Sequence, residues 1–294
     1  MSRTPTTARR LFDRFEPVHA LTYFAPESRT AVEQAGFHGF WTGYFAARSA
    51  PLGPVPAEVV TAVFYNFSAA HVARALPAAW EHADPASALR ARVSGAVAAL
   101  RRCGVTDDDA RPAADLLTKA AAAAPLDGRP LFAANHALAV PDEPLARLWH
   151  AATLLREQRG DGHVALLVAN GIGGRQCNVL HSLADRVPRD FIMRSRQYDE
   201  REWAGCLAHL AARGLVDDEG ALNDSGRAFE KRLEHDTDEL ALSAFDALDD
   251  TELERLFRTL TPITRAVIAG GDIPAATPMG LGRDDLSDDA AHLG

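Results

Sequence analysis

One stretch of the chain concentrates chemically versatile side chains. It runs from residue 145 to residue 174 and reads LARLWHAATLLREQRGDGHVALLVANGIGG. A helix over its first part places His150 and Glu157 on one face, because residues seven positions apart lie two turns from each other. His163 follows the sequence Arg-Gly-Asp-Gly, which we interpret as a turn. Two imidazoles and a carboxylate can transfer protons or bind a metal ion, so these three are the candidate catalytic residues.

The same side chains also have a purely structural interpretation. A buried histidine can donate to a backbone carbonyl, and Glu157 can pair with Arg156 or Arg159. The stretch has neither HExxH nor two histidines four residues apart, so we predict no metal site from it. The two arginines can instead hold a carboxylate or a phosphate through paired hydrogen bonds.

The end of the stretch, HVALLVANGIGG, imitates a strand that leads into a phosphate-binding loop. A dinucleotide fingerprint needs glycine where the chain has Gln176, and the Gly-Lys-Ser/Thr of a P-loop is absent. No GxSxG motif occurs, and none of the cysteines has a base near it in the sequence, so nucleophilic catalysis is unsupported. We interpret Cys103, Cys177 and Cys206 as buried small residues. The sequence identifies no cofactor.

A dense block of aromatic residues between positions 37 and 67 is the second candidate for a site. Core packing explains it, or it forms one wall of an apolar cavity that faces the His150 helix and suits a flat organic ligand. The candidate ligand-binding residues are His19, Phe40, Trp41, Tyr44, Phe64, Tyr65, Asn66, Thr153, Arg156 and Arg159.

Composition restricts the class of protein. The 294 residues are 47% hydrophobic and 24% charged, which is typical of a globular protein. No apolar run reaches the roughly 18 residues that a membrane-spanning helix needs. The N-terminus lacks the apolar core of a secretory signal, and the three cysteines form no CxxC pair, so we expect a cytoplasmic protein. A net charge of −9 disfavours binding to phosphate backbones.

Apolar periodicity, capping residues and prolines predict a mainly α-helical fold. Residues 1–10 are expected to be a disordered lead, and residues 50–55 a loop. Helices are expected at residues 11–25, 26–34, 57–65, 69–80, 87–103, 107–124, 144–159, 175–184, 199–213, 223–248 and 250–268.

Residues 199–240 carry a pattern of a known family. The run Leu-x-x-x-Gly-Leu begins at Leu210, and Gly-x-Leu-Asn-x-x-Gly-Arg begins at Gly220. This run resembles the recognition helix, wing and next helix of MarR-like winged-helix proteins, with Asn223 where a threonine is usual. Longer phrases, such as LWHAATLLREQRGDGH, are similar to an actinobacterial family of helix-turn-helix proteins over most of the chain. The resemblance implies a winged helix with a small β-hairpin at 215–222.

The two halves of the chain also resemble each other. HALT at His19 recurs as HAAT at His150, 131 positions later. We therefore expect two pseudo-repeated helical halves with a pocket between them. The predicted parts are an N-terminal helical half with a degenerate helix-turn-helix (1–124), a connector (125–144), a C-terminal winged-helix half (145–282) and a mobile acidic tail (283–294).

The surface that would read DNA is poorly suited to it. Asp217, Asp218 and Glu219 occupy the predicted wing, where the resemblance implies an arginine for the minor groove. Acidic side chains at that point repel phosphates, so DNA binding is disfavoured. No membrane partner is expected, and homodimerisation is an open question.

Two functions follow from these observations. The first is a winged-helix protein that binds a small organic ligand, as a sensor or transcriptional regulator with weak or no DNA binding. The second is an enzyme of small-molecule metabolism that uses His150, Glu157 and His163 as acid–base groups or as metal ligands in the cleft between the halves. Both functions predict a pocket, and the residues identify neither ligand nor substrate.

Overall fold

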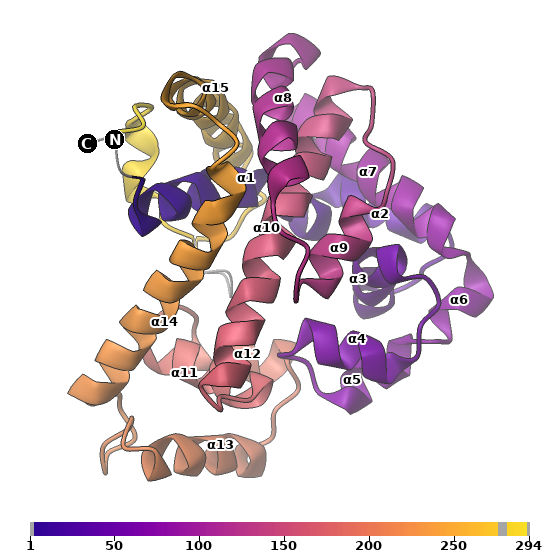
Figure 1. The fold of residues 1–294 in the computed structure, drawn as a ribbon. Coiled ribbons are helices and arrows are strands. Elements are labelled where there is room, and N and C mark those ends of the chain that lie inside the picture. Colours follow the sequence, from indigo (N-terminus) through magenta and orange to yellow (C-terminus); the bar gives the residue numbers. More distant parts are fainter. Residues whose placement is uncertain (1–2, 276–280, 293–294) are drawn as a thin grey trace.

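The computed structural model describes residues 3–275 and 281–292. Helices dominate these residues, which confirms the mainly α-helical class (Figure 1). The α-helices are α1 (Pro5–Phe24), α2 (Pro26–Gln34), α3 (Phe40–Ser49), α4 (Ala57–Phe64), α5 (Ala69–Ala75), α6 (Ala79–His82), α7 (Pro85–Arg102), α8 (Asp107–Ala123), α9 (Pro130–His136), α10 (Pro144–Ala169), α11 (Gly174–Leu183), α12 (Arg189–Ser195), α13 (Glu200–Ala212), α14 (Asp224–Leu242) and α15 (Asp250–Ala269). Short 3-10 turns are η1 (Ala50–Leu52), η2 (Ser243–Phe245) and η3 (Asp284–Ser287).

Helix α10 lies at the centre of the fold (Figure 1). It runs unbroken for 26 residues and contacts α1, α7, α8, α9 and α14. Its first 19 positions are buried almost all the way round, which is typical of a helix enclosed by others. Helices from both ends of the chain therefore pack on α10. Each side of α10 contacts a different set of helices.

The predicted Arg-Gly-Asp-Gly turn is wrong, because α10 continues through it. Arg159 donates to Asp238 at 2.8 Å and to Glu234 at 3.1 Å, both on α14. Asp161 accepts a hydrogen bond from the Phe132 amide at 2.9 Å. These distant partners hold both charged residues in helical conformation, and the apolar run that imitates a strand is the last part of the same helix.

The β-hairpin wing is not formed as a pair of strands. Residues 215–222 make one isolated antiparallel bridge, between Val216 and Leu222. The Asp217 carboxylate accepts hydrogen bonds from the Glu219 and Ala221 amides, at 3.1 and 2.9 Å, and so closes a tight turn in place of a longer ladder. Asn223 then caps α14 by accepting from the Gly226 amide at 2.9 Å.

The structure does not support two pseudo-repeated halves. His19 lies on α1, whereas His150 lies on the central α10, which packs against helices from both the first and the second half of the chain. The halves are therefore interleaved through α10 rather than packed as two equivalent units. The matching His-Ala phrases occupy helices with different surroundings, and the division of the chain into two halves and a connector stays a prediction.

Both ends of the described chain are packed. Helix α1 begins at Pro5, inside the expected disordered lead. Arg10 and Arg14 of α1 donate to the Asp285 carboxylate at 2.6 and 2.8 Å, so the acidic segment that was predicted to be mobile lies against α1. None of the described helices combines the length and apolar character needed to cross a membrane.

Three hydrophobic clusters organise the described residues. The largest joins α1, α7, α8, α10 and α15. The second contains the aromatic block, in which Phe45, Phe64 and Phe67 are buried while Phe40 is exposed. The third joins the end of α10 to α11, α12, α13 and the start of α14. The site described below lies beside α10, lined by members of the first two clusters.

Candidate functional site

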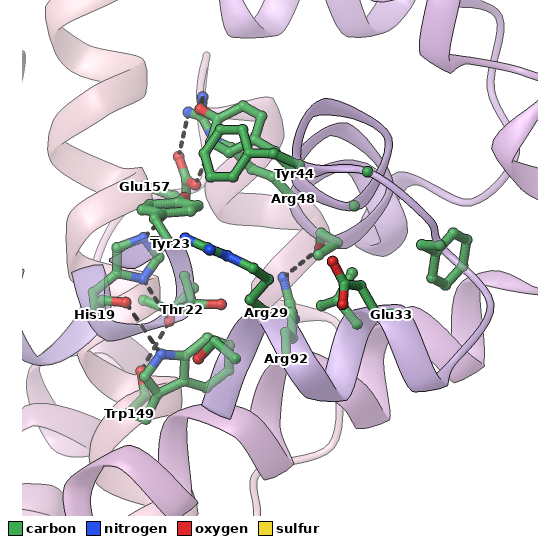
Figure 2. A pocket seen from close by; sticks show the side chains of 18 residues that line it. His19, Thr22, Tyr23, Arg29, Glu33, Tyr44, Arg48, Arg92, Trp149 and Glu157 are labelled. Carbon is green, nitrogen blue, oxygen red and sulfur yellow. Dashed lines mark hydrogen bonds and ion pairs between the residues drawn. The ribbon is translucent and has the colours of Figure 1, made fainter. Parts of the chain in front are cut away.

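A cavity of about 380 Å³ lies beside the second half of α10. Side chains of α1, α3, α11, α12 and α14, and of the turn between α4 and α5, surround it. We call it the central cavity; its volume is within the range of small-molecule sites. A narrower pocket of about 50 Å³ adjoins it, and we call this the His19 pocket (Figure 2). The two spaces share Tyr23, Arg29, Phe40, Tyr44, Arg48 and Glu157.

Most of the sequence-predicted residues line one of these two spaces. His19 and Thr153 line the His19 pocket, whereas His150 and Tyr65 line neither space. The Tyr65 hydroxyl instead donates to the Ile172 carbonyl at 2.6 Å. The central cavity is lined by Phe40, Trp41, Tyr44, Phe64, Asn66, Arg156, Glu157, Arg159 and His163. Their roles stay predictions.

His150 lies outside the two spaces, whereas Glu157 and His163 both line the central cavity. It lies thirteen positions before His163, which in a continuous helix places the two on opposite sides. Burial, with Arg92 and His136 nearby, lowers the pKa of His150 to about 4. Its Nε2 atom has no hydrogen-bond partner among the described residues. The three predicted catalytic side chains therefore do not form one site.

Glu157 is the centre of a buried ion network (Figure 2). Its two carboxylate oxygens each accept a hydrogen bond from Arg48, at 3.2 Å. Arg156 donates to one of them at 2.9 Å. Burial opposes ionisation, but the charges of Arg156 and Arg48 outweigh it and hold the pKa of Glu157 well below its usual range. This carboxylate is a permanent anion and is unsuited to proton transfer near neutral pH.

Glu16 of α1 lies on the same cavity in a different electrostatic state. It is fully buried, and neither of its oxygens has a hydrogen-bond partner among the described residues. The Nε atom of Arg156 is 3.6 Å away. Burial raises the pKa of Glu16 to about 7, against the lowering effect of Arg156. The sequence interpretation missed this residue, although a charged position inside the apolar α1 pattern was visible.

His19 is fixed by a chain of hydrogen bonds (Figure 2). The Thr153 hydroxyl donates to the Trp149 carbonyl at 2.9 Å, so its oxygen accepts from Nδ1 of His19, also at 2.9 Å. Nε2 of His19 then accepts from the Tyr23 hydroxyl at 3.0 Å. Burial lowers the pKa of His19 well below its usual value, so the ring is neutral.

Arg196 is a cation of the cavity wall without an acidic partner. Its guanidinium lies 4.3 Å from the centre of the Phe67 ring. No carboxylate among the described residues forms an ion pair with it, and its Nε atom has no hydrogen-bond partner there, nor has the hydroxyl of Ser195. Burial lowers the pKa of Arg196, with a further contribution from Arg48. The sequence does not single out Arg196, because the surrounding segment 188–196 is mostly polar.

Three potential metal ligands gather at the α11 end of the cavity. Donor atoms of His163, Cys177 and His181 all lie within 4.8 Å of one another. Burial lowers the pKa of His163 to about 3 and that of His181 to about 4, and it raises the pKa of the Cys177 thiol. The statement that no cysteine has a base nearby in the sequence is wrong for Cys177. His181 follows four positions later on the same helix, and this Cys-x-x-x-His spacing was the missed signal.

The fold and cavity define a helical protein with a cavity of small-molecule size. Residues 8–274 match the profile of a helix-turn-helix family. This match covers most of the 294 residues, so the chain belongs to that helix-turn-helix family. No curated protein and no solved structure matches the chain.

Proposed function

We propose that this helix-turn-helix protein is a sensor that binds a small organic anion in the central cavity. The observation that carries the proposal is Arg196, a cation of the cavity wall that lacks an acidic partner among the described residues. Arg196 is half-buried and its Nε atom is fully buried without a partner, which is unfavourable, and a ligand carboxylate would supply that partner. The neighbouring hydroxyl of Ser195 is free to donate to the same group.

The aromatic wall suits the body of such a ligand. Trp41, Tyr44 and Phe67 line the cavity, and the ring centres of Trp41 and Tyr44 lie 5.8 and 5.5 Å from that of Phe67. Flat apolar groups pack well against rings arranged in this way. A planar carboxylic acid therefore matches both the charge and the shape of the wall.

We further propose that α11 to α14 form a MarR-like winged helix whose wing is degenerate. Helix α13 exposes small residues, among them Ala204, Gly205 and Ala208, which offer no hydrogen bonds to base edges. Asp217 and Asp218, in the turn that follows, are also exposed. A surface of this kind should bind DNA weakly or not at all. The module formed by α11 to α14 serves mainly as a wall of the cavity.

The alternative of an enzyme using His150, Glu157 and His163 has less support. Glu157 is held as an anion by Arg48, and His150 lines neither the central cavity nor the His19 pocket. An enzyme on this scaffold would need a different set of acid–base residues, for which Glu16 and Asp161, both at the central cavity and both with a pKa near 7, are available.

Calorimetric titration with planar carboxylates tests the sensor proposal. Benzoate and indole-3-acetate serve as probes, and their neutral amides as matched controls. We expect only the carboxylates to bind, and Arg196→Met to weaken binding at least about tenfold, since a hydrogen bond to a charged group contributes roughly 1.5–3 kcal/mol. Arg194→Met, which alters an exposed arginine two positions earlier on α12, should leave binding unchanged. Equal binding of acids and amides would refute the proposal.

A second measurement addresses DNA. Fluorescence anisotropy with random-sequence duplex at low salt should show no binding in the micromolar range, because the acidic turn repels phosphates. Binding that weakens steeply with salt would contradict the degenerate-wing interpretation and leave the cavity proposal intact.

A further inference from the structure

We propose that His163, Cys177 and His181 bind one transition-metal ion, with Zn²⁺ as the reference ion, and leave a coordination position open toward the central cavity. The donor set is two imidazole nitrogens and one sulfur. Such a set suits Zn²⁺ and copper far better than Mg²⁺ or Ca²⁺, which require oxygen ligands. Sites with three protein ligands commonly keep the fourth position for water or a ligand.

The distances fit a tetrahedral ion. Cys177 Sγ lies 3.6 Å from Nε2 of His181. With Zn–S of about 2.3 Å and Zn–N of about 2.1 Å, tetrahedral geometry requires a sulfur–nitrogen separation of about 3.6 Å. The donor atom of His163 lies within 4.8 Å of the other two, so a shift of its ring by about 1 Å completes the set.

A hydrogen bond from α10 to α14 prepares His163 for this role. The Thr237 hydroxyl donates to the Leu233 carbonyl at 2.6 Å, so its oxygen is left to accept from Nδ1 of His163 at 2.9 Å. This arrangement protonates Nδ1 and leaves the lone pair of Nε2 unused. Fixing the tautomer of a ligating histidine through its other nitrogen is the usual function of a second layer of residues around a metal.

The surroundings supply access and negative charge. His163 and His181 both line the central cavity, so an ion between them faces its interior. Glu234, which also lines the cavity, is held by Arg159 at 3.1 Å and by Arg186 at 3.6 Å, and it contributes negative charge without being needed as a ligand. The metal site requires no organic ligand and therefore stands independently of the proposed function.

Metal titration of the full chain tests the proposal. The protein is stripped with EDTA and titrated with Zn²⁺ against a chromophoric chelator, and separately with Co²⁺, whose bond to a thiolate gives a near-ultraviolet charge-transfer band. We expect one ion per chain and a thiolate–Co²⁺ band. Cys177→Ser should abolish the band, and His181→Gln should weaken Zn²⁺ binding at least about 100-fold, since each removes one of three ligands. Cys206→Ser alters another buried thiol and should change neither.

Thr237→Val tests the positioning of His163 with all three ligands in place. This fully buried threonine is replaced by a side chain of similar shape that cannot accept the hydrogen bond. We expect Zn²⁺ affinity to fall about 10- to 100-fold. The proposal is overturned if stripped wild-type protein gives no thiolate–Co²⁺ band, or if Cys177→Ser retains Zn²⁺ binding. The first readout remains decisive should an individual variant fold poorly, because it uses only wild-type protein.

Discussion

The two ends of the central cavity differ in how their buried polar groups are paired. At the α3 end, Glu157 accepts hydrogen bonds from Arg48 and Arg156, so its charge is balanced by neighbours in the fold. At the α11 end, burial lowers the pKa of His163 and His181, so both rings are neutral, and no carboxylate forms an ion pair with either among the described residues. The first end has the properties of a completed structural network, whereas the second has those of a site prepared for a ligand.

Two buried carboxylates at this cavity show why burial alone does not decide ionisation. Glu157 and Glu16 are both almost fully buried. Glu157 has close hydrogen bonds from two arginines and stays ionised, while Glu16 has only Arg156 at 3.6 Å and its pKa rises to about 7. Hydrogen-bonded charge partners, rather than depth in the protein, separate the two states.

The largest expected effect comes from removing the charge at the α3 end. Glu157→Gln leaves the buried Arg48 and Arg156 without their carboxylate, and breaking a buried ion pair in this way costs about 3–5 kcal/mol. Urea unfolding at pH 7 measures the loss. Glu33→Gln changes an exposed carboxylate beside the His19 pocket and should alter stability by less than about 0.5 kcal/mol. A loss below about 1 kcal/mol for Glu157→Gln would contradict the network interpretation.

Much of the fold could be predicted because local signals fix it. Pro26 and Gly36 bound α2, and Asp199 caps α13 by accepting from the Glu202 amide at 2.7 Å. The full length of α10 could not be predicted, since it depends on partners far away in the sequence. Arg159 pairs with Asp238, 79 positions later, and no local pattern reports that contact.

Dependence on contacts that are distant in the sequence also explains which residues of the site could not be predicted. The aromatic wall was visible as a dense local block, of which Phe40, Trp41, Tyr44, Phe64 and Phe67 line the cavity. His163 and Cys177 belong to different helices, so their proximity depends on how α10 and α11 pack. Arg196 gave no signal in the sequence, because an arginine in a polar stretch is ordinarily exposed. Its significance comes from its place in the cavity wall and from a buried Nε atom without a partner among the described residues.

The second prediction is that Glu16 and Glu157 contribute differently to the pH dependence of stability. The folded-state pKa of Glu16, about 7, exceeds its unfolded value of 4.5, so its neutral form stabilises the protein at low pH and this contribution is lost as pH rises through 7. Glu16→Gln stays neutral and should gain about 2 kcal/mol relative to wild type between pH 5 and pH 8. Urea midpoints at the two pH values measure the gain.

In the same experiment, the stability contribution of Glu157 should depend on pH in the opposite direction. Its folded pKa is depressed, so its stabilisation is present above 4.5 and is lost as pH falls toward the folded value. The penalty of Glu157→Gln should therefore be no smaller at pH 8 than at pH 5. If both variants shifted in the same direction across this range, the contrast between the carboxylates would be lost.

The third prediction concerns a substitution that affects only the α11 end of the cavity. An alanine Cβ at Gly174 would lie 1.9 Å from the Tyr65 carbonyl oxygen and 3.0 Å from the Asn66 amide nitrogen. Both atoms are backbone, so α11 must move away from the turn between α4 and α5. We expect Gly174→Ala to lower stability by about 2 kcal/mol. Unchanged unfolding would show that this contact does not fix α11 against the cavity.

The smallest expected effect has the opposite sign and concerns α13. A Cβ at Gly205 would meet nothing within 4 Å, and glycine inside a helix costs about 0.5–1 kcal/mol relative to alanine. Gly205→Ala should therefore raise stability by that amount in urea unfolding. The same helical substitution thus costs stability on α11 and adds it on α13, because only α11 is pressed against other backbone. A loss of stability in Gly205→Ala would mean that the exposed face of α13 is covered by something that requires a glycine.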